Sequence, residues 1–137
     1  MLFVLSRKDM KIFLLLCAFV LTVEIEGALA PRIAFEKLKC GNERYVKDVL
    51  LHPRRDLMRR ESTLFLQEPF AIIIGCSDSR VSPELIFDQG VGDLFIIRVA
   101  GNVVGPIEQN SVNYAANILH AALIIVLGHE NCGAVKA

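Results

Sequence analysis

The sequence lacks an excess of charge of either sign, because 15 lysine and arginine residues balance 15 aspartate and glutamate residues. Without a basic surplus there is no sign of a nucleic-acid partner, and without an acidic tail there is no sign of a solvating role. Hydrophobic residues make up 53% of the 137 residues. That share excludes an intrinsically disordered chain. The length is enough for one domain with one core.

The sequence also lacks an apolar run of the length that a membrane span needs. The apolar stretch over residues 12–23 is short for a transmembrane helix. Basic residues at positions 7–11 precede it, and small residues ending at Ala30 follow it. This arrangement predicts a signal peptide over residues 1–30, cleaved near Ala30, and a periplasmic or secreted protein whose mature form has no membrane segment.

Cysteine is scarce, with four residues in the chain. Cys17 falls in the predicted signal peptide and Cys40 in a helix-like stretch, which leaves Cys76 and Cys132. In an exported protein, two cysteines are read by default as a disulfide. His129 lies three residues before Cys132 and favours a metal site instead, while a disulfide in metal-free material stays open.

Apolar runs and turn residues alternate along the chain from Pro31. Their spacing predicts helices and strands in the order helix 31–51, strand 70–75, helix 83–89, strand 93–99, helix 106–120 and strand 122–127. Ser82 is the expected N-cap of the second helix. Strand 93–99 is nearly all apolar and is expected to be buried on both faces. The alternation predicts an α/β fold, with a mostly parallel sheet and flanking helices.

Two candidate metal ligands directly follow predicted strands. Cys76 comes after strand 70–75, and His129 comes after Leu127 and Gly128 at the end of the last strand. Because the carboxyl ends of parallel strands share one edge of the sheet, these residues and Cys132 are expected to converge there. Two thiolates and one imidazole suit zinc, and three protein ligands leave a coordination position open for water, as in catalytic zinc sites.

Asp78 and Arg80 follow Cys76 at intervals of two residues. An aspartate beside a metal binds it directly or forms a hydrogen bond to its water. An arginine that grips the aspartate with two hydrogen bonds holds it off the metal and keeps it ionised. We therefore interpret the two residues as a pair that works with the metal.

Three segments together resemble the β-class carbonic anhydrases. They are GCSDSR over residues 75–80, GDLFIIRVAGN over residues 92–102 and GHENCGAV over residues 128–135. Their order and separation match the family, and the resemblance extends over residues 31–137. It implies reversible, zinc-dependent hydration of carbon dioxide to bicarbonate and a proton.

The resemblance also implies a role for each site residue. The implied Zn²⁺ ligands are Cys76, His129 and Cys132. Asp78 and Arg80 are the implied catalytic dyad, with Asp78 as a possible fourth ligand. The implied substrate pocket consists of Gln67 from a partner subunit, the apolar walls Phe95 and Tyr114, and the backbone amide of Gly133. A homodimer or a higher oligomer is expected.

One departure from the family keeps other functions open. Members of the family continue past the second zinc cysteine with a further helix and strand, whereas this sequence ends at Ala137. We therefore expect a short form that lacks this helix and strand. The first alternative is a non-catalytic zinc-binding paralogue or dimer partner. The second is a related hydrolase on the same scaffold, of the type that acts on carbon disulfide.

Overall fold

The fold is built on three parallel strands in one sheet. The structure is a computed structural model and describes residues 29–137, so residues 1–28 of the predicted signal peptide lie outside the described residues. The strands are β1 (Ala71–Gly75), β2 (Leu94–Arg98) and β3 (Leu123–Leu127), in the order β2-β1-β3. This arrangement confirms the predicted α/β class with a mostly parallel sheet.

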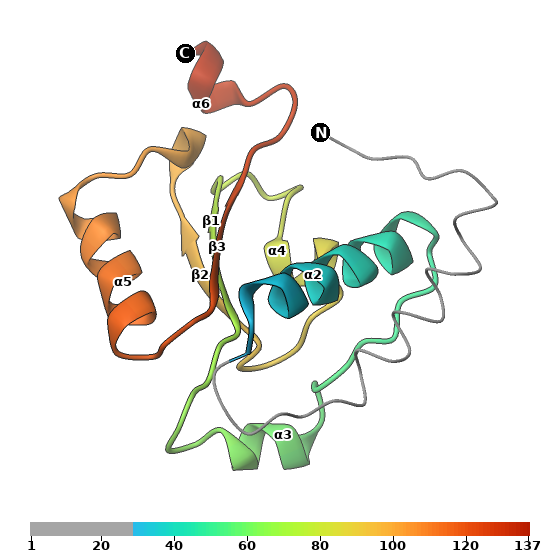
Figure 1. The fold of residues 1–137 in the computed structure, drawn as a ribbon. Coiled ribbons are helices and arrows are strands. Elements are labelled where there is room, and N and C mark those ends of the chain that lie inside the picture. The colour runs from blue at the N-terminus through green and yellow to red at the C-terminus, as the bar shows by residue number, and fades with distance from the viewer. Residues whose placement is uncertain (1–28) are drawn as a thin grey trace.

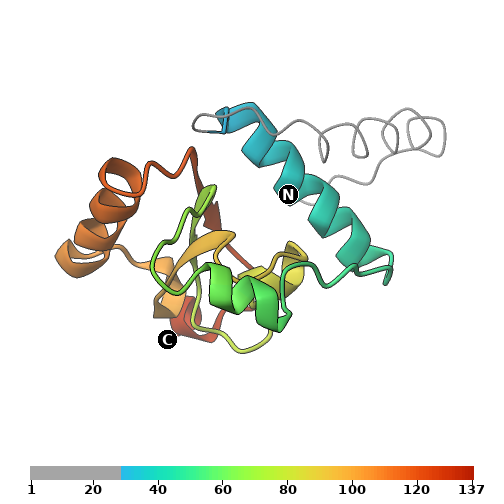
Figure 2. The same cartoon turned by 90° about the horizontal axis from the view of Figure 1, so that it is seen from below.

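Helices cover both faces of the sheet (Figures 1 and 2). The helices are α2 (Pro31–Val46), α3 (Leu57–Ser62), α4 (Pro83–Ile86), α5 (Pro106–Asn117) and α6 (Gly133–Lys136), with a short 3₁₀ turn, η1 (Ala100–Asn102). Helices α2 and α4 lie on one face and α5 on the other, whereas α3 and α6 lie near opposite ends of the strands. The helix α6 thus marks the edge of the sheet where the strands end.

The core is centred on β1, every residue of which is buried. Its side chains alternate between two apolar clusters, as the pleat of a strand requires. Ile73 packs in the cluster that contains Ala34 and Leu38 of α2. Ile72 packs in the cluster on the opposite face, which contains Ala115 of α5. The helices on both sides therefore hold the central strand in place.

The predicted two-sided burial of strand 93–99 is wrong. Of the residues in β2, only Ile97 is buried, and the others are half-buried. The reason is the strand order, which puts β1 in the centre and leaves β2 at an edge. At the opposite edge, Ile124 and Val126 of β3 are 47% and 67% exposed. The apolar cluster under α5 draws on β1 and β2 and does not include them.

All three predicted helices end earlier than their apolar spacing suggested, and α5 ends at Asn117 rather than at residue 120. The helix α2 stops at Val46 because Asp48, at a φ of 56°, turns the chain away. The helix α4 has a single turn, and Ser82 stands at its N-cap position without capping the backbone. The Ser82 hydroxyl donates instead to the carboxylate of Glu84, at 3.5 Å.

The helix α3 was not predicted, because its sequence reads as a charged segment. Its start depends on Asp56, whose carboxylate accepts a hydrogen bond from the backbone N–H of Arg59 at 2.8 Å. An N-cap of this kind satisfies one of the free N–H groups at the start of a helix. The segment is therefore ordered by a local polar contact rather than by burial of an apolar face.

A buried carboxylate holds the chain after α2 against the chain after α4. Asp88 is fully buried, and its carboxylate accepts from Arg44 Nε at 2.6 Å and from the backbone N–H groups of Leu51 and His52 at 3.0 Å each. Burial alone would raise the pKa of Asp88, but the N–H donors of Leu51, Arg44 and His52 outweigh it and lower the pKa. The carboxylate is therefore charged, and it satisfies the backbone N–H groups of Leu51 and His52, which lie past the end of α2.

We predict that Asp88→Asn lowers the free energy of unfolding by about 3 kcal/mol, because it removes the charge of the fully buried carboxylate and leaves the half-buried Arg44 guanidinium without its countercharge. The measurement is urea unfolding followed by circular dichroism. The matched control is Glu68→Gln, which also replaces a carboxylate with an amide but at an exposed residue. It should leave the free energy of unfolding almost unchanged. A loss below about 1 kcal/mol, the net value of one ordinary hydrogen bond, would contradict the prediction.

Candidate metal centre

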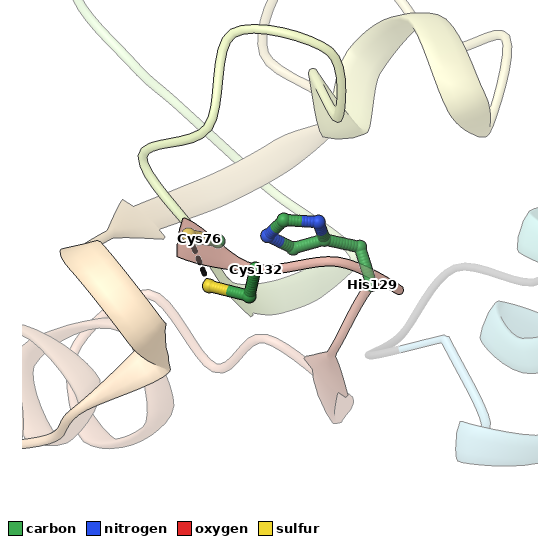
Figure 3. Close-up of side chains that lie close together, drawn as sticks. All are labelled: Cys76, His129 and Cys132. Atoms are coloured by element: carbon green, nitrogen blue, oxygen red, sulfur yellow. Dashed lines mark hydrogen bonds between the residues drawn. The ribbon is translucent and has the colours of Figure 1, made fainter. Parts of the chain in front are cut away.

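The three predicted ligands converge at the carboxyl ends of β1 and β3. Gly75 pairs with Leu127 in the parallel register, so the segments that carry Cys76 and His129 leave the sheet side by side. The ligand atoms of Cys76, His129 and Cys132 all lie within 4.8 Å of one another. Figure 3 shows the imidazole ring directed toward the two sulfur atoms. The group could hold a metal ion.

The distance between the sulfur atoms fits metal ligands rather than a disulfide. The Sγ atoms of Cys76 and Cys132 are 3.8 Å apart, and both side chains are free thiols in buried positions. A disulfide bond would be about 2.05 Å long. Two sulfur ligands at about 2.3 Å from a tetrahedral zinc ion lie about 3.8 Å apart, which is the spacing found here.

The imidazole of His129 has the tautomer that metal binding requires. Its Nδ1 lies 3.0 Å from the backbone carbonyl oxygen of Glu130. Because a carbonyl oxygen only accepts, we assign the ring proton to Nδ1, which leaves a lone pair on Nε2. Nε2 is buried and has no hydrogen-bond partner among the residues that the structure describes. A metal ion would satisfy this atom, and the contact from Glu130 would hold the ring in place.

The surroundings of Cys76 favour its thiolate form. The pKa of Cys76 falls to about 6, chiefly because the backbone N–H of Asp78 donates toward the sulfur, with His129 and the N–H of Gly101 adding to the effect. The Gly101 nitrogen lies 3.3 Å from the sulfur. In turn, the pKa of His129 is raised, first through its contact with Cys76. Without metal, the thiolate and the ring thus stabilise each other's charged forms.

Asp78 and Arg80 form the predicted two-bond pair. Arg80 donates from Nε to Oδ1 at 2.9 Å and from Nη2 to Oδ2 at 2.7 Å. The backbone N–H of Arg80 also donates to Oδ1, at 3.0 Å. The hydrogen bonds from the Arg80 side chain are the main cause that holds the pKa of Asp78 well below its usual range. The carboxylate is therefore ionised throughout the physiological range.

One oxygen of this carboxylate remains able to accept a further hydrogen bond. Each carboxylate oxygen offers about two lone pairs. Oδ1 uses both on Arg80, whereas Oδ2 accepts one bond from Arg80 and lies 3.9 Å from His129 Nε2. Asp78 is not one of the three residues whose ligand atoms cluster. Its free acceptor site therefore adjoins the metal centre, while Arg80 occupies the rest of the carboxylate.

Comparison with known proteins identifies the family. The carbonic anhydrase family model matches residues 71–137. The carbonic anhydrase of Mycolicibacterium smegmatis is 48% identical over 107 residues, which cover 78% of this chain and 52% of that protein. The β-carbonic anhydrase of Coccomyxa, solved with acetazolamide, has a TM-score of 0.54 at 33% identity and covers 72% of this chain and 42% of its own. This chain belongs to the β-carbonic anhydrase family.

The match covers part of the relatives only, because the chain spans about half the length of the curated carbonic anhydrases that it resembles. A third comparison is with the tetrameric β-carbonic anhydrases of Sordaria macrospora, at a TM-score of 0.50 and 27% identity over 72% of this chain and 50% of that one. Over residues 29–137, no helix combines the length and apolar character needed to span a membrane.

The residues expected to form the β-carbonic anhydrase substrate pocket are dispersed in the described chain. Phe95 of β2 and Tyr114 of α5 contact each other, with ring centroids 6.2 Å apart, on the α5 side of the sheet. Gln67 is exposed and precedes the amino end of β1, at the edge opposite Cys76. Gly133 begins α6 directly after Cys132. The pocket roles of these four residues stay predictions.

Two polar residues at the metal centre have no predicted role from the sequence. Arg98, the last residue of β2, donates to the backbone carbonyl oxygens of Cys76 and Asp78. Asn102 donates to the carbonyl oxygen of Leu127 at 2.6 Å. Their position is the one feature of the sequence that could have indicated a role at the metal centre. Both residues lie at or just after the end of β2, which reaches the same edge of the sheet as the two strands that carry ligands.

We predict that metal affinity weakens as the pH falls through about 6. Below the pKa of Cys76, which lies at about 6, protons compete with the metal for the sulfur. The measurement is Co²⁺ binding by the full chain under reducing conditions, from about pH 5 to about pH 8. Cys76→Ser is the control and should bind Co²⁺ weakly at every pH. Equal affinity at the two ends of this range would contradict the prediction.

Proposed function

We propose that the chain catalyses the zinc-dependent, reversible hydration of carbon dioxide to bicarbonate and a proton. One observation carries the proposal: among the described residues, two thiols and an imidazole nitrogen without a hydrogen-bond partner converge beside a carboxylate that keeps one acceptor site open. A three-ligand group of this kind is typical of catalytic rather than structural zinc sites. The family to which the chain belongs supports the same reaction.

Cys76, Cys132 and His129 would hold the ion through their two sulfur atoms and Nε2. Zn²⁺, when bound there, supplies the Lewis acidity that makes a water molecule a nucleophile near neutral pH. The donor set fits the ion, because the sulfur spacing matches tetrahedral zinc and Nε2 has no other partner among the described residues. Both cysteines are buried, which limits the access of bulk water to their sulfur atoms.

Asp78 would orient the reacting water through Oδ2. This oxygen has a free lone pair beside the metal centre, so it can accept a hydrogen bond from the water and turn the oxygen's own lone pair toward carbon dioxide. Because Arg80 keeps the pKa of Asp78 low, the carboxylate accepts this bond without retaining the proton. We propose that Asp78 remains paired with Arg80 and does not become a fourth metal ligand.

We propose that the working form is a homodimer or a higher oligomer of this chain. Leu64, Phe65 and Leu66 are 69%, 98% and 63% exposed, just before Gln67. Three successive large apolar side chains in water favour a covering partner. A second copy seated there would bring Gln67 toward its neighbour's pocket. Sedimentation velocity tests this proposal: Phe65→Ser should shift an oligomer toward monomers, and a wild-type monomer at working concentration would reject it.

We also propose that residues 1–30 direct export, with the mature protein in the periplasm or outside the cell. The basic segment, apolar run and small residues of the sequence support this proposal. Fractionation of cells that express the full chain, with mass spectrometry of the amino terminus, tests it. An unprocessed protein confined to the cytoplasm would reject it.

We predict that Asp78→Asn lowers carbon dioxide hydration by about 100-fold or more, because asparagine has a single acceptor oxygen. When Arg80 holds that oxygen, the amide NH₂ group takes the place of Oδ2 and cannot accept a hydrogen bond from the reacting water. Stopped-flow hydration measures the rate, and metal analysis should still find one zinc ion per chain. Asp56→Asn is the matched control, since asparagine also caps α3, and it should leave the rate unchanged.

Two outcomes would contradict the proposal. Turnover that is unaffected by Asp78→Asn would remove Asp78 from the reaction. Wild-type protein with one zinc ion per chain and no turnover would favour the non-catalytic zinc-binding alternative.

We predict that the hydration rate rises steadily from about pH 6 to about pH 9. Two thiolates give the metal more negative charge than neutral imidazoles would, so they weaken its Lewis acidity and raise the pKa of the reacting water above about 7. Asp78 does not produce this rise, because its carboxylate is already ionised at every pH in the range. The measurement is the hydration rate in matched buffers of constant ionic strength. A flat profile over this range would contradict the prediction.

A further inference from the structure

The segment after β2 supplies no metal ligand, yet it contacts both segments that do. This bracing segment, Arg98–Asn102, begins at the end of β2 and includes η1. From it, Arg98 bonds to the loop that carries Cys76, and Asn102 bonds to Leu127, two residues before His129. Because the strand order is β2-β1-β3, the bond from Asn102 spans the end of β1.

Arg98 bonds to the two residues of its loop that carry the reactive side chains. Its Nε donates to the carbonyl oxygen of Cys76 at 2.9 Å, and its Nη2 donates to the carbonyl oxygen of Asp78 at 2.5 Å. A guanidinium is planar, and its donors have fixed directions. Holding two carbonyl groups from one rigid plane therefore fixes the peptide planes at Cys76 and Asp78, and with them the directions of both side chains.

These bonds depend on the Arg98 side chain and not on the pairing of the strands. The backbone of Arg98 pairs with Gly75 and would do so with another side chain at this position. Lysine carries a single ammonium on a flexible stem, so it can reach one carbonyl but cannot reproduce the two-bond geometry. The comparison of arginine with lysine thus separates positioning of the loop from mere presence of positive charge.

We propose that Arg98 is a positioning residue for the metal centre, which fixes the Cys76 sulfur and the Asp78 carboxylate by holding the carbonyl groups of their own residues. Asn102 acts in the same way on the approach to His129, through Leu127. The inference rests on the proposed zinc site and adds to it residues that neither bind the ion nor touch the substrate. Contacts behind the ligands commonly set metal affinity by about 10- to 100-fold.

The test is Co²⁺ binding by the full chain, followed through the visible absorption bands of the bound ion, whose intensity and position report coordination geometry. We expect Arg98→Met and Arg98→Lys both to lower Co²⁺ affinity, by about 10- to 100-fold, and to alter the bands. Arg59→Met is the matched control. Its guanidinium also donates to a backbone carbonyl, that of Val91 at 2.8 Å, and its loss should leave affinity and bands unchanged.

Each other outcome overturns the proposal in a recognisable way. If folded Arg98→Met or Arg98→Lys binds Co²⁺ with wild-type affinity and wild-type bands, Arg98 does not position the site. If both variants fail to fold by circular dichroism, Arg98 serves the fold rather than the metal centre. If the wild-type chain itself binds no Co²⁺ while Arg98 variants remain folded, the zinc site fails, and the positioning role fails with it.

Discussion

The parallel pairing of β1 with β3 is the constraint on which the metal centre depends. Fifty-three residues separate Cys76 from His129 along the chain, the difference between their positions, and no local turn could bring them together. The register that pairs Gly75 with Leu127 ends both strands at the same level, so their following residues leave the sheet at one point. A shift in that register would separate the sulfur from the imidazole without altering either loop.

Hydrogen bonds to side chains and to the backbone then convert this rough convergence into a defined site. Arg80 holds the Asp78 carboxylate, and the carbonyl oxygen of Glu130 fixes the His129 ring. Arg98 holds the loop between Cys76 and Asp78 from the neighbouring strand. Arg80 and Arg98 each donate two hydrogen bonds from one planar guanidinium, which fixes the direction of the contact as well as its length. The site is therefore built by hydrogen bonds at the rim of an apolar sheet.

The sequence predicted the elements that have strong local signals and missed those that depend on tertiary context. The strands were found because short apolar runs lie between turn residues, and the ligands because Cys76 and His129 follow such runs. The strand order has no local signal, so the half-burial of β2 was not predicted. The roles of Arg98 and Asn102 were missed because hydrogen bonds to distant carbonyl groups leave no spacing pattern.

The central claim is that two sulfur atoms and one ring nitrogen of this chain surround a single zinc ion. X-ray absorption at the zinc edge, on protein purified under reducing conditions with zinc supplied, tests it most directly. The account predicts one zinc ion per chain with two sulfur neighbours at about 2.3 Å and one or two lighter neighbours at about 2.0 Å. Protein without zinc, or zinc surrounded only by oxygen and nitrogen, would contradict it.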